Sequence, residues 1–349
     1  MRVLTYKEID REEWNALVKA SATGTWFQTP EAYCFYESMP EFFRPFVVAV
    51  ERVNDLANER TLRGVCVGDV TVEKSAVKQG LTRRAIIIGG PCLADDCANE
   101  EVSLLLSTLR QQLSTGANAP IYIESRNFND YSRWKDAFAS AGFDYKAHLN
   151  FHVDCRDKEA MWERMSENRR RQVRKAQATV ECLTNEGISE LEVREWYEIL
   201  RMLYRTKVKT PLWPVEFFLE AYRQGVGNFL LVKHEGKVIG GSMVVMSERV
   251  KELGNEGTVY EWFECGLNAD YKEQYPSVMA TWAGMQYANG HGCARYDMMG
   301  AGVPGVPYGV RDFKSEFGGE LVEHGRFLCV NNPVLYKMGV LAVKLLKRK

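Results

Sequence analysis

The chain of 349 residues is longer than one hydrophobic core usually supports, so we expect two domains. Hydrophobic residues make up 46% and charged residues 26% of the sequence, a balance that is typical of globular proteins and excludes a disordered chain. The net charge of −1 excludes nucleic-acid binding by the whole surface, so any polyanion must meet a local basic patch.

The segments that could direct the chain to a membrane or to an oxidising compartment are missing from the sequence. Residues 1–14 are polar and charged, unlike a signal peptide, and no long uncharged apolar run follows. The nine cysteines are odd in number and form no C-x-x-C pair, which argues against a zinc ribbon and a disulfide framework. We therefore predict a cytoplasmic protein.

The first half alternates between stretches typical of strands and of helices. β-branched residues mark the strands, and leucines at helical spacing mark the first helix. The predicted elements are strands at 46–51, 62–72 and 83–88, a helix at 100–113, a strand at 121–124, a helix at 131–141 and a strand at 145–153.

The second half gives a clearer order of elements. Pro214 is suited to the first turn of a helix, and Glu235-Gly236-Lys237 is typical of a hairpin turn. The predicted elements are helices at 191–209 and 214–223, strands at 229–234, 238–246 and 258–264, a helix at 277–288 and a strand at 294–298. This order resembles the core of GNAT acyltransferases, and the first half resembles a looser copy. We predict an α+β fold with mixed sheets and domains at 1–155 and 156–330.

A basic segment at 164–175 has six cations and one anion, so its charges do not neutralise each other as on an ordinary surface helix. On a helix, residues four apart are neighbours, which stacks Arg170 over Arg174 and Arg171 over Lys175. A solvated helix face and a polyanion-binding face are both consistent with this pattern.

Two segments near the C-terminus could carry chemistry. The strand 294–298 ends in Gly300-Ala301-Gly302, where glycines could admit a ligand close to the backbone. Asp297 in this turn could orient an amine or act as a base, although a strand-end aspartate more often forms a turn. Further on, Phe313 and Phe317 lie four residues apart, on one face of a short helical turn.

The residues of these segments resemble a known family. YDMMGAG at 296–302 and YGVRDFKSEFGGELVEHGRF at 308–327 resemble the C-terminal part of the Fem-like proteins, the FemABX group of aminoacyl-tRNA-dependent peptidoglycan-bridge transferases. The resemblance extends more faintly over nearly the whole chain. It includes GTWFQT at 24–29, the basic stretch SENRRRQVRKA at 166–176 and PVEFF at 214–218.

The resemblance implies two tandem GNAT-like domains, with residues 331–349 forming a helix that returns to pack on the first. It implies an enzyme in which an amine of a cell-envelope (peptidoglycan) precursor attacks the ester of an aminoacyl-tRNA, with no cofactor and no metal. Lys314 matches the family lysine that binds the tRNA acceptor end and supports transfer. Asp297, Glu261 or the substrate itself is left as the base. The implied substrate-binding residues are Trp213, Phe217, Phe313, Tyr308, Arg311 and Gln28. The implied tRNA-binding residues are Arg170, Arg171, Arg174 and Lys175.

The chain departs from the family at positions that contact the precursor. Tyr33-Cys34-Phe35-Tyr36 stands where a lysine is expected, Trp213 stands for an arginine, and Phe217 stands for a tyrosine. The acceptor therefore stays open. An acyl-CoA-dependent N- or O-acyltransferase acting on an envelope polysaccharide or small amine is the first alternative. A binding module for tRNA or precursor without turnover is the second.

The C-terminal tail at 331–349 predicts an amphipathic basic helix. Its apolar residues suit packing on the first domain, and its basic end suits contact with lipid headgroups. Peripheral contact with the inner face of the membrane is thus part of the prediction.

Overall fold

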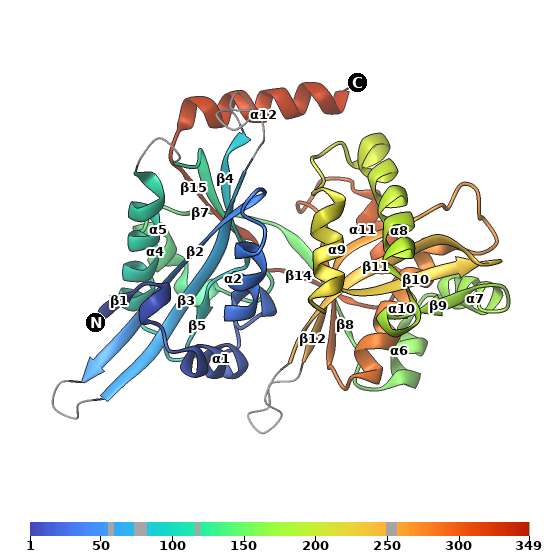
Figure 1. Cartoon of the computed structure of the whole chain (residues 1–349), viewed down its shortest axis with the longest axis horizontal. Helices are drawn as coiled ribbons and strands as arrows, with labels where there is room; N and C mark the ends of the chain where they lie inside the picture. Colours follow the sequence, from blue (N-terminus) through green and yellow to red (C-terminus); the bar gives the residue numbers. More distant parts are fainter. Residues whose placement is uncertain (55–58, 73–81, 116–118, 249–256, 349) are drawn as a thin grey trace. The chain divides into compact units, whose positions relative to one another are not determined.

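The computed structural model describes the chain except residues 55–58, 73–81, 116–118, 249–256 and 349 (Figure 1). It divides into two compact units. The first comprises residues 1–148 together with the C-terminal stretch from Glu323, and the second comprises residues 149–248 and 256–322. Each unit contains one large sheet and the helices that pack on it.

The first unit is built on an eight-stranded mixed sheet in the order β1-β2-β3-β4-β6-β15-β7, with β5 pairing with β3. Its strands are β1 (Arg2–Leu4), β2 (Phe43–Asn54), β3 (Glu59–Thr71), β4 (Arg84–Gly89), β5 (Cys92–Leu93), β6 (Tyr122–Asn127), β7 (Asp144–Lys146) and β15 (Arg326–Val330). Its helices are α1 (Arg11–Ala20), α2 (Pro30–Glu37), α4 (Asn99–Ser114), α5 (Lys135–Ser140) and α12 (Pro333–Arg348). The strands β4 and β6 run parallel, and α4 connects them.

The second unit is built on a seven-stranded mixed sheet in the order β14-β8-β13-β12-β11-β10-β9. Its strands are β8 (Leu149–Asp154), β9 (Glu181–Leu183), β10 (Asn228–His234), β11 (Lys237–Ser247), β12 (Thr258–Gly266), β13 (Arg295–Gly300) and β14 (Glu320–Glu323). Its helices are α6 (Lys158–Arg164), α7 (Glu167–Ala176), α8 (Glu190–Leu203), α9 (Val215–Arg223), α10 (Pro276–Gly290) and α11 (Gly309–Ser315). Here β12 and β13 run parallel, and α10 connects them.

The two units repeat one order of elements. The series α1, α2, β2, β3, β4, α4, β6 in the first unit matches α8, α9, β10, β11, β12, α10, β13 in the second. The predicted α+β fold with mixed sheets in two tandem domains of like element order is confirmed. The C-terminal helix α12 groups with the first unit, where the ring of Tyr336 meets that of Tyr122 at 5.4 Å between centroids. The predicted domain limits at 155 and 330 stay a prediction.

Within the described residues, the chain passes between the two units at two places, each time between two consecutive short strands. The strands β7 and β8 follow each other directly, yet β7 pairs with β15 in the first sheet and β8 pairs with β13 in the second. In the same way, β14 belongs to the second sheet and the next strand, β15, to the first. The predicted single strand at 145–153 is therefore wrong. The first strand ends at Lys146 because residues 144–146 pair in the first sheet and residues 149–154 pair in the second.

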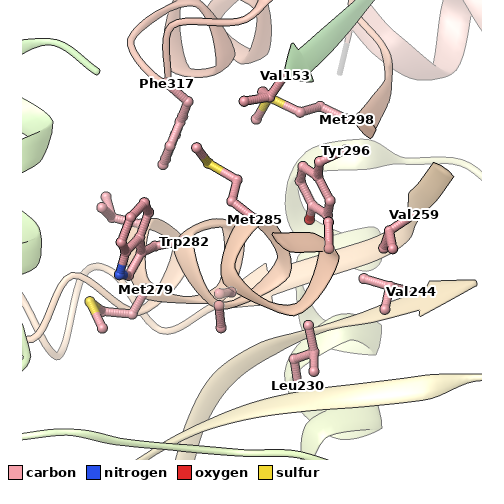
Figure 2. Close-up of a cluster of buried hydrophobic side chains, with 14 of the residues drawn as sticks. Val153, Leu230, Val244, Val259, Met279, Trp282, Met285, Tyr296, Met298 and Phe317 are labelled. Atoms are coloured by element: carbon pink, nitrogen blue, oxygen red, sulfur yellow. The ribbon is translucent and has the colours of Figure 1, made fainter. Parts of the chain in front are cut away.

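The hydrophobic core of the second unit lies between α10 and its sheet. Figure 2 shows Met279, Trp282 and Met285 of α10 among side chains from the neighbouring strands and from the segment after α11. Because α10 is apolar around most of its surface, most of its residues are buried. This core fixes the ends of β12 and β13, where the candidate site lies.

Candidate functional site

The candidate site lies where β12 and β13 separate. The two parallel strands pair only from Thr258 to Tyr260 on β12, opposite Arg295 to Asp297 on β13. Beyond this point β13 carbonyls no longer face a partner on β12. The ammonium of Lys314 instead donates hydrogen bonds to the carbonyl oxygen of Met298 and, at 3.1 Å, to that of Gly300. Lys314, predicted from the sequence, thus lies at the strand separation.

Two carboxyl groups of β12 lie on one face of the sheet because the strand has a bulge. Val244 of β11 pairs with Glu261, whereas the preceding Met243 pairs with Phe263, so Trp262 is the extra residue. The bulge shifts the alternation of side chains, which brings Glu264 to the same face as Glu261. Thr281 of α10 donates a hydrogen bond to Glu261 at 3.2 Å on this face.

The three charged groups shift one another's protonation. Burial raises the pKa of Glu264 to about 8, and the like charge of Glu261 adds to this effect. Burial also raises the pKa of Glu261, against the opposing ammonium of Lys314. Burial lowers the pKa of Lys314, although the neighbouring carboxylates act in the opposite direction. A carboxyl pair that shares a proton near neutral pH can serve as general base and then as general acid.

The helix α11 holds Lys314 through its two phenylalanines. Phe317 is fully buried and points toward Met285 and Trp282 (Figure 2), and the ring of Phe313 lies 5.3 Å from that of Phe317. The turn after α11 depends on Gly318, which has a φ of +74° and whose Cβ, if present, would collide with the carbonyl of Arg164. The FKSEFGG motif at 313–319 therefore holds Lys314 in a fixed position.

The basic helix α7 contributes one buried cation, Arg169, which packs on Phe313 and Phe317. Arg169 is only 7% exposed, and its guanidinium lies over the rings of Phe313 and Phe317 at 4.4 and 5.2 Å. It also pairs with Glu316 at 3.5 Å. Burial lowers the pKa of Arg169. Sequence reasoning missed this role, although Arg169 stands within the quoted basic motif.

The other predicted cations of α7 lie at its surface. Arg171 and Arg174 are exposed, and Arg170 is partly exposed. Lys175 pairs with Glu273, and the guanidinium of Arg174 lies 5.3 Å from the ring centroid of Trp162. The helix thus divides its cations between one that packs on α11 and several that meet solvent.

The loop before α11 is organised by Arg311. Its guanidinium donates to the carbonyl oxygens of Ala301, Val306 and Val303, at 2.9, 3.0 and 2.6 Å. Tyr308 caps the start of α11 and is 42% exposed, so its ring is accessible. Because three backbone carbonyls occupy Arg311, its main effect is to shape the loop that leads from β13 to Lys314.

Asp297 lies beneath the turn at the end of β13. It is fully buried, lies 3.2 Å from the imidazole of His152, and accepts a 2.7 Å hydrogen bond from the backbone of Met299. Burial raises its pKa, but His152 and Arg295 outweigh this effect, so the pKa of Asp297 lies below its ordinary value. Met299 has a φ of 55°, which the Asp297 hydrogen bond supports. This geometry makes Asp297 a turn-former and not an accessible base.

The predicted Trp213 and Phe217 join an aromatic cluster on the bulge. Their ring centroids lie 4.1 Å apart, and both rings meet Trp262, at 5.5 and 5.4 Å. Phe217 is fully buried, whereas Trp213 and Trp262 are partly exposed. The cluster supports the bulge that sets the two glutamates.

Gln28 belongs to the interior of the first unit. It is fully buried, and its amide bonds Val67 and Ile88, which lie on β3 and β4. This amide bridges two strands where their own ladder is interrupted, so its contacts in the first unit are structural.

One protein-family model and several solved structures match this chain. The sequence model of the FemAB family matches residues 254–344, which include β12, α10, β13 and α11. No curated protein matches the sequence. The predicted resemblance to Fem-like acyltransferases is confirmed, and the matched segment contains Glu261, Glu264 and Lys314.

Solved structures share the fold, and the following three are among them. The crystal structure of FemX superposes with a TM-score of 0.68 at 14% identity, over 97% of this chain and 99% of that one. The structure of L-PGS from Bacillus licheniformis gives a TM-score of 0.53 at 12% identity, over 97% of both chains. The C-terminal domain of a putative lysylphosphatidylglycerol synthetase from Agrobacterium fabrum gives 0.50 at 12% identity, over 96% of this chain and 95% of that one. Within the described part of this chain, no helix combines the length and apolar character needed to cross a bilayer.

Proposed function

We propose that this chain, a Fem-like acyltransferase, moves an aminoacyl group from charged tRNA to an amine of a cell-envelope (peptidoglycan) precursor. The observation that carries the proposal is the position of Lys314 beside Glu261 and Glu264 at the separation of β12 and β13. The group combines a fixed cation with a carboxyl pair, as an amine attacking an ester requires.

In the proposed reaction, the acceptor nitrogen forms a bond to the ester carbonyl carbon. The nitrogen loses a proton to Glu264, the more exposed member of the carboxyl pair. The carbon–oxygen bond to the tRNA ribose then breaks, and the leaving oxygen takes up the proton. An ammonium has three N–H donors, and two of those on Lys314 bond β13 carbonyls. The third would stabilise the oxyanion or hold a terminal phosphate of the tRNA.

The exposed cations of α7 support a polyanionic donor. Arg170, Arg171 and Arg174 follow one another at helical spacing on a helix that Arg169 ties to α11. The donor would thus meet positive charge in the same unit as the carboxyl pair. We take no cofactor to be needed, since the ester itself is the activated group.

The acyl-CoA alternative has less support in this structure. Where α10 begins, the side chain of Asn268 accepts a 3.2 Å hydrogen bond from the backbone of Ser277 and donates one to its hydroxyl at 2.7 Å. Asn268 thus uses a backbone donor that a pyrophosphate could otherwise bind. The alternative stays an outcome of the assay below.

We place the reaction in the cytoplasm, with peripheral contact at the inner membrane face through α12. This helix has no acidic residue in its sequence, and its Val334, Met338 and Leu341 are 67, 56 and 59% exposed. Sedimentation with anionic phospholipid vesicles tests the contact. Protein that stays in the supernatant at low salt contradicts it.

The deciding experiment incubates the protein with a pool of charged tRNAs and envelope precursors and identifies the products by mass spectrometry. We expect an aminoacylated precursor, and we expect Lys314→Ala to lower its rate of formation by about 100-fold or more. Lys158→Ala, which removes an exposed lysine at the start of α6, serves as the matched control. Transfer from acetyl-CoA in place of tRNA would favour the alternative. No product from either donor would contradict an acyltransferase role.

A further inference from the structure

The sheet of the first unit carries a second charged group that the proposed reaction does not use. Asp69 of β3 pairs with Ile86 of β4, which pairs with Glu124 of β6, so these side chains share one face. Arg84 lies two residues before Ile86 on β4 and Arg126 lies two residues after Glu124 on β6, so both face the same way, one on each side of the row that contains Asp69. Arg326 pairs with Arg126 across the next strand. We call these five residues the arginine face.

Both oxygens of one carboxylate of the arginine face, that of Glu124, accept hydrogen bonds from neighbouring arginines. Glu124 accepts from Arg126 at 2.7 Å through one oxygen and from Arg326 at 3.0 Å through the other. Arg326 also lies 3.0 Å from the imidazole of His148. Burial raises the pKa of Glu124, but the two guanidiniums outweigh this effect and lower its pKa to about 2. Two cations thus share one anion, which leaves positive charge in excess.

The other members retain polar atoms without partners in the described part of the chain. The Nε of Arg84 and one oxygen of Asp69 are buried without a hydrogen bond. So is the hydroxyl of Tyr36, which α2 holds close enough to interact electrostatically with Asp69 and Arg126. Asp69 and Tyr36 are each only 2% exposed. Buried polar atoms without partners are costly and rare, and three on one face indicate a ligand with matching groups.

The mixture of charges decides which ligand fits. A phosphate dianion would suit the guanidiniums but would meet the carboxylates of Asp69 and Glu124. A purely cationic ligand would meet Arg84 and Arg126. A ligand that carries one carboxylate and one ammonium satisfies both signs, and guanidiniums bind carboxylates in a two-pronged geometry.

We propose that the arginine face binds a zwitterionic amino-acid group, with its carboxylate at Arg84 and Arg126 and its ammonium at Asp69 beside the Tyr36 hydroxyl. This binding of an amino acid goes beyond the proposed transfer reaction and does not depend on it.

The proposal is tested by titrating the full-length protein with L- and D-alanine and following binding by calorimetry or ligand-observed NMR. N-acetylalanine, which lacks the ammonium, and alaninamide, which lacks the carboxylate, should each bind at least roughly tenfold more weakly. Inorganic phosphate should not displace alanine. Absence of alanine binding, or displacement by phosphate at equal concentration, would overturn the proposal.

Two variants assign the binding to the arginine face. Asp69→Asn should remove the preference for alanine over N-acetylalanine, and Arg84→Gln should remove the preference over alaninamide. Arg44→Gln, which removes an exposed guanidinium of β2, should change neither. If Asp69→Asn fails to fold, as judged by its thermal unfolding, the partly exposed Arg84 still provides the test. Alanine binding unaffected by Arg84→Gln would place the ligand elsewhere.

The outcome is independent of the transfer assay. A transferase that does not bind alanine would keep its proposed function and lose this site. A protein that binds alanine through Asp69 and Arg84 but transfers nothing would keep the site and lose the function.

Discussion

The protonation of Glu264 affects the stability of the folded protein. Its pKa of about 8 in the folded protein lies above the ordinary glutamate value of 4.5, because it is buried beside Glu261. Between these two values the folded protein binds more protons than the unfolded chain. The contribution of Glu264 therefore favours folding at the acidic end of this window and is lost as the pH rises through about 8.

We predict that the free energy of unfolding declines less steeply from pH 5 to pH 9 in Glu264→Gln than in the unchanged protein. One group can change this slope by at most about 1.4 kcal/mol per pH unit. Urea unfolding at a series of pH values measures it. Glu195→Gln, at an exposed position of α8, is the control and should leave the slope unchanged. An identical slope in Glu264→Gln would show that its pKa is ordinary.

The contrast between Lys314 and Glu264 shows what the sequence could predict of the site. Lys314 stands in a distinctive motif, so it was predicted. Glu264 was not, because strict alternation along β12 puts residues 261 and 264 on opposite faces. Only the bulge at Trp262 brings them together, and the bulge depends on the pairing with β11. Glu261 was named only as one of several bases.

At the scale of elements, the arginines of α7 have two different roles. Arg169 is buried and packs on α11, whereas the arginines on the other side of the helix meet solvent. We predict that Arg169→Met lowers the free energy of unfolding by roughly 2–4 kcal/mol, because it leaves Glu316 and the backbone of Phe313 without a buried cation. Since Arg169 positions α11, the transfer rate should fall with it. Arg171→Met on the exposed side should change stability little. Urea unfolding of both variants checks this prediction.

The exposed side of the same helix should show the opposite behaviour. Replacing Arg170, Arg171 and Arg174 together by Ala should keep the fold and weaken the binding of charged tRNA. The dependence of log Kd on log salt should become shallower by about two to three units, since each lost phosphate contact removes about one. Filter binding at several salt concentrations measures this slope. An unchanged slope would exclude α7 from the tRNA surface.

The hairpin of β10 and β11, whose partners are local, was predicted, whereas β15, whose partners are distant, was not. The hairpin of β10 and β11 was expected from its turn, and Glu235 and Gly236 indeed adopt positive φ values of 49° and 76°. By contrast, β15 is a five-residue run between two loops, and its partners β6 and β7 lie about 180 to 200 residues earlier. Nothing in local periodicity identifies such a strand.

At the scale of the whole molecule, the first unit depends on the last strand of the chain. The strand β7 has β15 as its neighbour in the sheet, and β15 also covers the edge of β6. We predict that a fragment of residues 1–148 aggregates, because these edges are left open. Joining residues 323–349 to that fragment through a flexible linker should restore solubility. Size-exclusion chromatography and circular dichroism distinguish the two.

The second unit provides the control for this prediction. Residues 149–322 contain all of its strands except the last residue of β14, together with α6 to α11. This fragment should fold without the remainder of the chain. A soluble and cooperatively unfolding fragment of residues 1–148 would show that β15 is dispensable.

The placement of β15 also bears on how the protein is synthesised. A nascent chain usually folds domain by domain from its N-terminus as it leaves the ribosome. Here the first unit to be translated is the last that can close its sheet, since β15 emerges after the whole second unit. The edges of β6 and β7 therefore stay unpaired until β15 is synthesised, and chaperones could bind them during this time. A premature stop before residue 326 would leave the first unit open even when the second is complete.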